Sequence, residues 1–188
     1  RRNRINNDKE NKLKIIIDVS NAAIDSANSG VIRVTRRLSK ELQNFANLTF
    51  VLWDNVNEAY VYPTKRESEI LQTYNGPSVD VSHPISIEGS RLKLEESIIH
   101  SAKNFDWLLI PEITKEQIFR KKRIFADIYN LKTASIFYDA IPILHPELVK
   151  NDDIRDNHAA YMKGLSKVDV VVSISNYSAK CLIDFWEG

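Results

Sequence analysis

The sequence predicts a Rossmann-like α/β fold, with a doubly wound, mainly parallel sheet and helices on both of its faces. Short apolar runs alternate with amphipathic stretches along the chain, which is typical of βαβ units. The first run contains three consecutive isoleucines, as expected of a strand that is buried on both faces of a parallel sheet. Alternation and run composition together indicate this fold class.

The first elements are a strand at residues 13–19 and a helix that begins near Val31. Residues 1–12 are rich in Arg, Asn, Asp and Lys and have little apolar surface, so we expect a disordered basic tail and a folded domain over residues 13–188. The apolar face of the helix is predicted from residues that recur at helical spacing. They are Val31, Val34, Leu38, Leu42 and Phe45.

The middle of the chain is the least regular part. A strand is predicted at residues 48–53, after which the periodicities fade and turn formers such as Asn75-Gly76-Pro77 accumulate as far as residue 101. We expect mainly irregular structure there, with short helices at residues 64–74 and 92–102.

Strands and helices alternate again in the second half. Strands are predicted at residues 106–110, 133–138 and 168–174, and helices at residues 115–129, 152–166 and 176–186. His158 lies on the apolar face of the helix at 152–166. Two interpretations stay open for it, a histidine packed in the core and a histidine that lines a ligand cleft.

Composition excludes several classes of protein. The 26 Lys and Arg residues nearly balance the 25 Asp and Glu residues, which gives no electrostatic argument for a nucleic-acid partner. The single cysteine, Cys181, excludes an internal disulfide and suits a reducing cytoplasm. The histidines lack metal-ligand spacing, so no metal is expected. The glycine motifs of dinucleotide dehydrogenases, P-loop NTPases and serine hydrolases do not occur.

The richest candidate site is the loop that follows the strand at residues 133–138. Asp139 stands where the strand ends, at the edge at which open α/β sheets bind ligands. Its carboxylate either faces that crevice or caps a local turn, as Asp readily does. His145 lies between Leu144 and Pro146, where it either serves a ligand, as a hydrogen-bond partner or as an acid or base near neutral pH, or is an exposed loop histidine.

Three further places offer weaker candidates. Ser29 and Gly30 begin the first helix, where backbone N–H groups and the helix dipole favour an anion such as a diphosphate. Arg33, on the first turn, either binds phosphate or forms a surface ion pair. Ser175 is an N-cap of the last helix, with or without a ligand contact. The basic run at residues 120–123 is either a solvated helix face or a contact for anionic lipid headgroups.

These segments resemble the glycosyltransferases of family GT4. The loop reads Tyr138-Asp139-Ala140-Ile141-Pro142, followed by Pro146-Glu147, and the later strand reads Val168-Asp169-Val170-Val171-Val172-Ser173. The first helix begins Gly30-Val31-Ile32-Arg33, which is similar to the Gly-Ile-x-Arg helix start of those enzymes. The resemblance covers about two thirds of the chain and departs from the family at Tyr138, where many members have His.

The resemblance implies the N-terminal, acceptor-side domain of a retaining GT-B hexosyltransferase. Such an enzyme transfers a sugar from a nucleotide-sugar to a glycan or lipid-linked acceptor, here in bacterial surface polysaccharide synthesis, without a metal or other cofactor. Asp139 and His145 are then expected to be catalytic. The expected substrate-binding residues are Ser29, Gly30, Arg33, Tyr138 and Ser175.

The resemblance also implies a partner and a location. The nucleotide-sugar domain of a GT-B enzyme is its C-terminal half, which is absent from these 188 residues, so the fragment alone is expected to be inactive. The expected location is the cytoplasm, with peripheral contact at the inner face of the membrane as an option. Two alternatives are a non-catalytic GT-B-like binding or assembly module of a larger protein, and an unrelated doubly wound domain of flavodoxin or receiver type.

Overall fold

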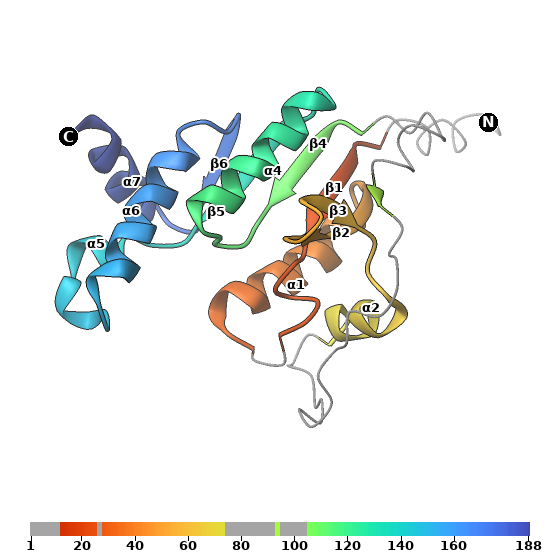
Figure 1. Cartoon of the computed structure of the whole chain (residues 1–188), viewed down its shortest axis with the longest axis horizontal. Helices are drawn as coiled ribbons and strands as arrows, with labels where there is room; N and C mark the ends of the chain where they lie inside the picture. The colour runs from red at the N-terminus through yellow and green to blue at the C-terminus, as the bar shows by residue number, and fades with distance from the viewer. Residues whose placement is uncertain (1–11, 26–27, 74–92, 95–104) are drawn as a thin grey trace, which may run out of the picture. The chain divides into compact units, whose positions relative to one another are not determined.

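The computed structural model describes residues 12–25, 28–73, 93–94 and 105–188. Contacts between Cα atoms divide the chain into two compact units, Arg1–Leu108 and Leu109–Gly188. Figure 1 traces the elements of both units in chain order. The prediction of one folded domain over residues 13–188 stays a prediction.

The first unit is built on a parallel pair of strands with an antiparallel strand at its edge. Strand β1 pairs in parallel with β2, with Lys14 opposite Asn47 and Asp18 opposite Val51, and β2 pairs antiparallel with β3. The strand order is β3-β2-β1, with the beginning of β4 beside β1. The elements of this unit are β1 (Lys14–Asp18), α1 (Gly30–Leu42), β2 (Asn47–Asp54), β3 (Ala59–Val61) and α2 (Lys65–Leu71).

Local sequence explains where the two helices of this unit begin. The Ser29 hydroxyl accepts a hydrogen bond from the Ile32 N–H, which caps α1. At α2, Thr64 and Glu67 form a capping box, in which each side chain accepts a hydrogen bond from the other residue's backbone N–H. Both helices therefore start at residues whose side chains satisfy otherwise unpaired donors.

The predicted helix is present, but its apolar residues are not its most deeply buried ones: four of the five, Val31, Val34, Leu38 and Leu42, are half-buried. Helix α1 buries Ile32, Thr35, Arg36 and Ser39, whereas Phe45, just beyond its end, is 73% exposed. Polar side chains are tolerated on the inner face because they are hydrogen-bonded there. The Ser39 hydroxyl donates to the Thr35 carbonyl at 2.7 Å, and the Thr35 hydroxyl donates to the Val31 carbonyl at 3.1 Å.

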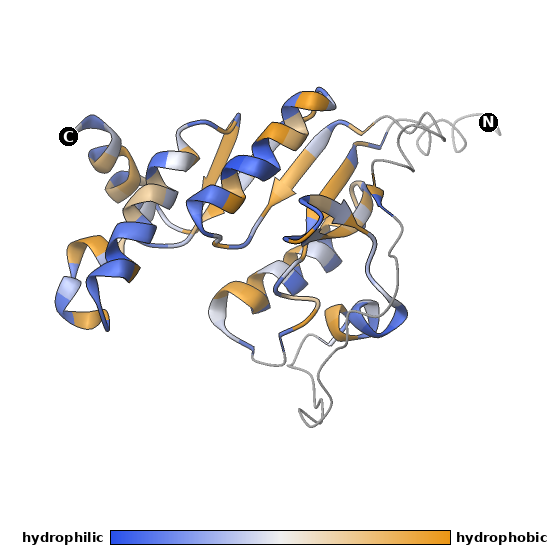
Figure 2. Ribbon diagram, in the orientation of Figure 1, coloured by the Kyte–Doolittle hydropathy of each residue, from blue (hydrophilic) through white to orange (hydrophobic). Residues whose placement is uncertain are grey.

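The second unit repeats the βαβ pattern. Strands β5 and β6 pair in parallel, with Ala134 opposite Val170 and Phe137 opposite Ser173, and the end of β4 lies on the other side of β5. The elements are β4 (Trp107–Ile110), α4 (Glu116–Ile128), β5 (Lys132–Phe137), α5 (Ile141–Leu144), the 3-10 helix η1 (Pro146–Leu148), α6 (Asp152–Leu165), β6 (Val170–Ser173) and α7 (Asn176–Glu187). Figure 2 shows β4 and β6 as largely hydrophobic, and the helices with mixed colouring.

The core of the second unit joins α4, α6 and β5. The rings of Phe119 and Tyr161 meet edge to face at 5.7 Å, and the Tyr161 hydroxyl donates to the Ile136 carbonyl at 3.1 Å. Gly164 lies close to the Phe119 ring, and a Cβ there would lie 3.2 Å from it, so a larger residue would require the ring to shift slightly. Burial raises the pKa of the Tyr161 phenol, so this hydroxyl stays a hydrogen-bond donor.

The basic run on α4 is not a uniform solvated face. Arg120 is exposed, but Lys122 is 1% exposed, and the guanidinium of Arg123 lies 5.7 Å from the centre of the Phe119 ring. Long basic side chains pack their aliphatic stems against apolar surface in this way. Two of the four basic residues, Lys122 and Arg123, thus contribute to the packing of α4. Fewer charged groups of the run therefore remain to contact anionic lipid headgroups.

The structure confirms the predicted fold class: it is α/β and Rossmann-like, with a mainly parallel sheet flanked by helices. The elements β3, α5 and η1 were not predicted, because they are short and lie in segments rich in turn formers. The predicted basic tail at residues 1–12 lies outside the described residues apart from Lys12, and so does the predicted helix at 92–102 apart from 93–94. Among the helices that the structure describes, none is long and apolar enough to cross a membrane.

Candidate functional site

Asp139 combines a structural role with an available oxygen. It follows the end of β5, and its Oδ1 accepts a hydrogen bond from the Ile141 N–H at 3.0 Å, which starts α5. Among the described residues, no hydrogen bond reaches the other carboxylate oxygen, and the residue is half-buried. Asp139 is therefore a turn cap, as one interpretation held, that still presents an acceptor oxygen next to the loop.

The side chain of His158 hydrogen-bonds to the backbone of Asp139. Its Nε2 lies 2.9 Å from the Asp139 carbonyl oxygen, so this nitrogen carries the proton and donates. The imidazole is buried against Phe137 and Tyr161, at ring distances of 6.5 and 5.9 Å. Of the two interpretations, the packed and hydrogen-bonded histidine is the one that the structure shows.

Tyr138 points its side chain into the fold. It is 5% exposed, and its hydroxyl donates to the Pro111 carbonyl at 2.8 Å. This bond ties the end of β5 to the end of β4. The expected contact between Tyr138 and a substrate stays a prediction, and the buried side chain leaves mainly the backbone of this residue to make it.

Ser178, which was not predicted as a site residue, links Ser175 to Tyr138 by hydrogen bonds. The Ser175 hydroxyl caps α7 by accepting from the Ser178 N–H at 3.0 Å, and the buried Ser178 hydroxyl donates to the Tyr138 carbonyl at 2.7 Å. The first turn of α7 is thereby fixed to the residue before Asp139. The spacing Ser-x-x-Ser directly after an apolar strand is the signal that could have found it.

His145 belongs to a separate pair. It is exposed, and its Nδ1 lies 3.2 Å from Oε1 of Glu147. The pKa of the Glu147 carboxyl is lowered, first by a hydrogen bond from its own backbone N–H and then by His145. Among the described residues, no hydrogen bond joins His145 to Asp139, so the structure does not connect the two predicted catalytic residues.

The predicted anion site of the first unit is open. Ser29 and Gly30 are exposed, and a Cβ added at Gly30 would meet no atom within 4 Å. Arg33 is exposed on the first turn, and its guanidinium has no partner among the described residues. The N–H groups at the start of α1 and one exposed cation are the parts that such a site needs.

Arg36 is the basic residue of α1 that sequence reasoning missed. It is 1% exposed, and its guanidinium donates to the carbonyls of Ala22 and Asp25 at 3.0 and 2.8 Å, and to Oδ1 of Asn28 at 3.5 Å. These bonds fix the loop between β1 and the start of α1. A faint signal exists, because a loop of small residues leaves carbonyl groups that a long donor must satisfy.

Two acids at strand ends serve the fold of the first unit. Asp18 is fully buried and accepts hydrogen bonds from Ser20 and from the Tyr60 hydroxyl, the latter at 2.9 Å. Asp54 caps the turn before β3 by accepting from the Val56 N–H at 2.8 Å. Each carboxylate thus stabilises the local structure at the end of its own strand.

An apolar groove lies beside the Asp139 loop. We call it the loop groove; it has a volume of about 380 Å³ and lies between α5, α6 and α7. Its apolar walls include Ile143, Leu144, Met162, Tyr177 and Phe185. Lys180 and Asp184 also line it and neutralise each other in an ion pair at 2.6 Å. The groove thus offers an uncharged, apolar surface.

The described residues contain no cluster of three or more His, Cys, Asp or Glu side chains that is placed to hold a metal ion.

In comparisons with known proteins, no family model matched the chain, and neither a curated protein nor a solved structure matched it significantly.

Proposed function

We propose that this chain is the acceptor-side domain of a retaining glycosyltransferase that uses a nucleotide-sugar donor. The observation that supports this most is the setting of Asp139 at the carboxyl end of β5. Its backbone is held by His158, its Oδ1 is engaged by the Ile141 N–H, and its second oxygen has no partner among the described residues. A carboxylate restrained in this way is preorganised to orient a sugar hydroxyl.

Each further candidate has a proposed role. His145 assists as an acid or base, with Glu147 orienting its ring through Nδ1. Ser29, Gly30 and Arg33 bind the diphosphate of the donor through N–H groups and a guanidinium. Helix N-termini and basic side chains neutralise a leaving diphosphate, so the proposal requires no metal.

The loop groove supports an amphiphilic acceptor. Its apolar walls begin at Ala140, the residue after Asp139. An acceptor whose hydroxyl lies at Asp139 can therefore place an apolar portion in the groove, which favours a lipid-linked acceptor and peripheral contact with a membrane.

The test uses calorimetric titration with UDP, GDP and their sugar conjugates. The titrated proteins are this chain and the chain extended by its natural downstream sequence, which is proposed to supply the nucleotide-sugar domain. Binding by the extended form is expected, together with turnover that Asp139→Asn lowers by about 100-fold or more. Asparagine keeps the Oδ1 acceptor of the turn, removes the charge and replaces the second oxygen by an amide nitrogen, which donates instead of accepting. Asp54→Asn, at another turn cap, is the matched control and should keep full turnover.

A second candidate is a non-catalytic binding or assembly module. The buried Tyr138 favours it, because that side chain is directed to Pro111 at a position where many GT4 enzymes have a histidine. If the folded extended protein binds no nucleotide, this candidate replaces the transferase.

A further inference from the structure

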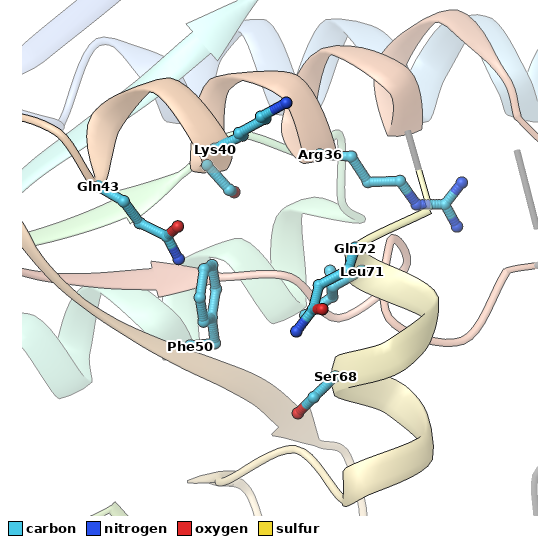
Figure 3. A pocket seen from close by; sticks show the side chains of 8 residues that line it. Arg36, Lys40, Gln43, Phe50, Ser68, Leu71 and Gln72 are labelled. Atoms are coloured by element: carbon cyan, nitrogen blue, oxygen red, sulfur yellow. The ribbon is translucent and has the colours of Figure 1, made fainter. Parts of the chain in front are cut away.

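The first unit contains a polar pocket that none of the roles above uses. It has a volume of about 380 Å³ and is bounded by α1, β2 and α2. We call it the α1–α2 pocket. Six of its lining residues are Lys40, Gln43, Phe50, Ser68, Leu71 and Gln72, and Figure 3 shows how their side chains lie.

An aromatic ring and the amides of two exposed glutamines, Gln43 and Gln72, line this pocket. The half-buried Phe50 projects from β2, and Figure 3 shows the amide of Gln43 reaching toward it from α1 and that of Gln72 from α2. Among the described residues, neither side-chain amide has a hydrogen-bond partner. Each amide therefore brings a donor and an acceptor to the same space.

The remaining groups add hydrogen-bonding capacity and little charge. The Ser68 hydroxyl donates to the Thr64 carbonyl at 2.9 Å, which leaves its oxygen as an acceptor. Lys40 lines the pocket with an ammonium group that already has an interaction of its own, and among the described residues no carboxylate lines the pocket. Arg36 also borders it, but its guanidinium donates to loop carbonyls. Since both basic residues already have partners, the described lining does not favour a polyphosphate, and a purely apolar ligand would leave the amides without hydrogen-bond partners.

We infer that the α1–α2 pocket is a carbohydrate subsite that binds one neutral or singly negative sugar ring. A pyranose has an apolar C–H face, which fits against the Phe50 ring, and a rim of hydroxyls that both donate and accept. Side-chain amides match such hydroxyls because they also do both. A small set of polar groups around an aromatic surface is the usual make-up of a small-ligand pocket. The inference depends on these side chains and not on the proposed transferase activity.

Ligand-detected and amide-detected NMR titrations of this 188-residue chain test the inference. The probes are glucose, galactose, mannose, N-acetylglucosamine, glucuronate and their short β-linked oligomers, with inorganic phosphate and UDP as competing classes. At least one sugar is expected to saturate the protein with a Kd of about 1 mM or tighter. Its largest shifts should fall on the amides of Gln43, Phe50 and Gln72.

Matched variants locate the binding. The double variant Gln43→Ala/Gln72→Ala and the single variant Phe50→Leu should each weaken sugar binding by about tenfold or more. The controls remove the same groups elsewhere: Phe45→Leu changes a phenylalanine that is 73% exposed, and Gln117→Ala changes an exposed glutamine on α4. Both should bind sugar as the parent does. The double glutamine variant keeps the test decisive if Phe50→Leu fails to fold.

Three outcomes would overturn the inference. They are no saturable sugar binding by the folded chain, binding that survives the double glutamine substitution, and binding of phosphate or UDP alone. Asp139→Asn separates this inference from the proposed function, because it should lower turnover of the extended protein by about 100-fold or more and leave sugar binding at the α1–α2 pocket intact.

Discussion

His158 and Asp139 are 19 residues apart in the sequence and are joined by one hydrogen bond, from the imidazole Nε2 to the Asp139 carbonyl at 2.9 Å. The bond fastens helix α6 to the loop that follows β5. Because the imidazole is buried, loss of the bond leaves a carbonyl whose partner water cannot easily replace.

His158→Leu should therefore lower the free energy of unfolding by about 1–3 kcal/mol. His158→Gln, which keeps a side-chain N–H, should recover part of that loss. Urea denaturation followed by far-UV circular dichroism measures both. Equal stability of the leucine variant and the parent would contradict a structural role for this bond.

Arg36 should be the most costly arginine to replace on α1. Arg36→Met removes the donors that hold the Ala22 and Asp25 carbonyls in the β1–α1 loop, and we expect a loss of about 3 kcal/mol in unfolding free energy. Arg36→Lys should rescue little, because an ammonium cannot reproduce the planar fork. The exposed Arg33 and Arg37 provide the controls, and Arg33→Met should change stability by less than about 0.5 kcal/mol.

Asp169 should make stability depend on acid pH. The pKa of its carboxyl is lowered, chiefly by the Thr133 backbone N–H at 2.7 Å and then by the Thr133 hydroxyl at 2.8 Å. A lowered pKa means that the ionised form stabilises the folded state. The contribution is complete above the ordinary value of 3.8 and is lost as the pH falls through the folded-state pKa.

Urea titrations between about pH 2 and pH 6 measure this dependence. The stability of the parent should exceed that of Asp169→Asn above about pH 5, and the two should converge in acid. Asp127→Asn, at an exposed aspartate, is the control and should follow the parent throughout. A constant difference between the parent and Asp169→Asn would show that the carboxyl does not titrate differently in the folded state.

Gly30→Ala separates folding from ligand binding at the start of α1. A Cβ there meets no atom within 4 Å, so the variant should be as stable as the parent or up to about 1 kcal/mol more stable. If the open N-terminus binds a diphosphate, the added methyl group should weaken that binding in the extended protein. Thermal unfolding and calorimetry with UDP measure the two effects, and a loss of stability would show that Gly30 is required for the fold itself.

The strands and long helices were predictable because they depend on apolar runs and helical spacing. The buried face of α1 was not, since hydrophobic spacing cannot reveal that Thr35, Arg36 and Ser39 satisfy their polar groups internally. The same limit hid Lys122, which looked like part of a charged surface. Pattern analysis assigns charge to the exterior, and only three-dimensional contacts identify the exceptions.

The candidate site was predictable in its location and less so in its detail. Asp139 and Ser175 could be assigned to strand ends from the sequence. Asp139 is held by His158, which is 19 residues away in the sequence, and the start of α7 is fixed by the bond from Ser178 to the Tyr138 carbonyl, 40 residues away. Residues whose role is to hold site residues in place by hydrogen bonds form no pattern that a single sequence reveals.

The loop groove contains Cys181, and this is the only cysteine in the chain. A thiol-reactive fluorophore would therefore label a single site, with no need to remove other sulfhydryls first. The emission of the fluorophore would report whether the surface beside the Asp139 loop is exposed to water or covered by a bound ligand. The chain thus carries its own attachment point for an optical sensor of acceptor binding.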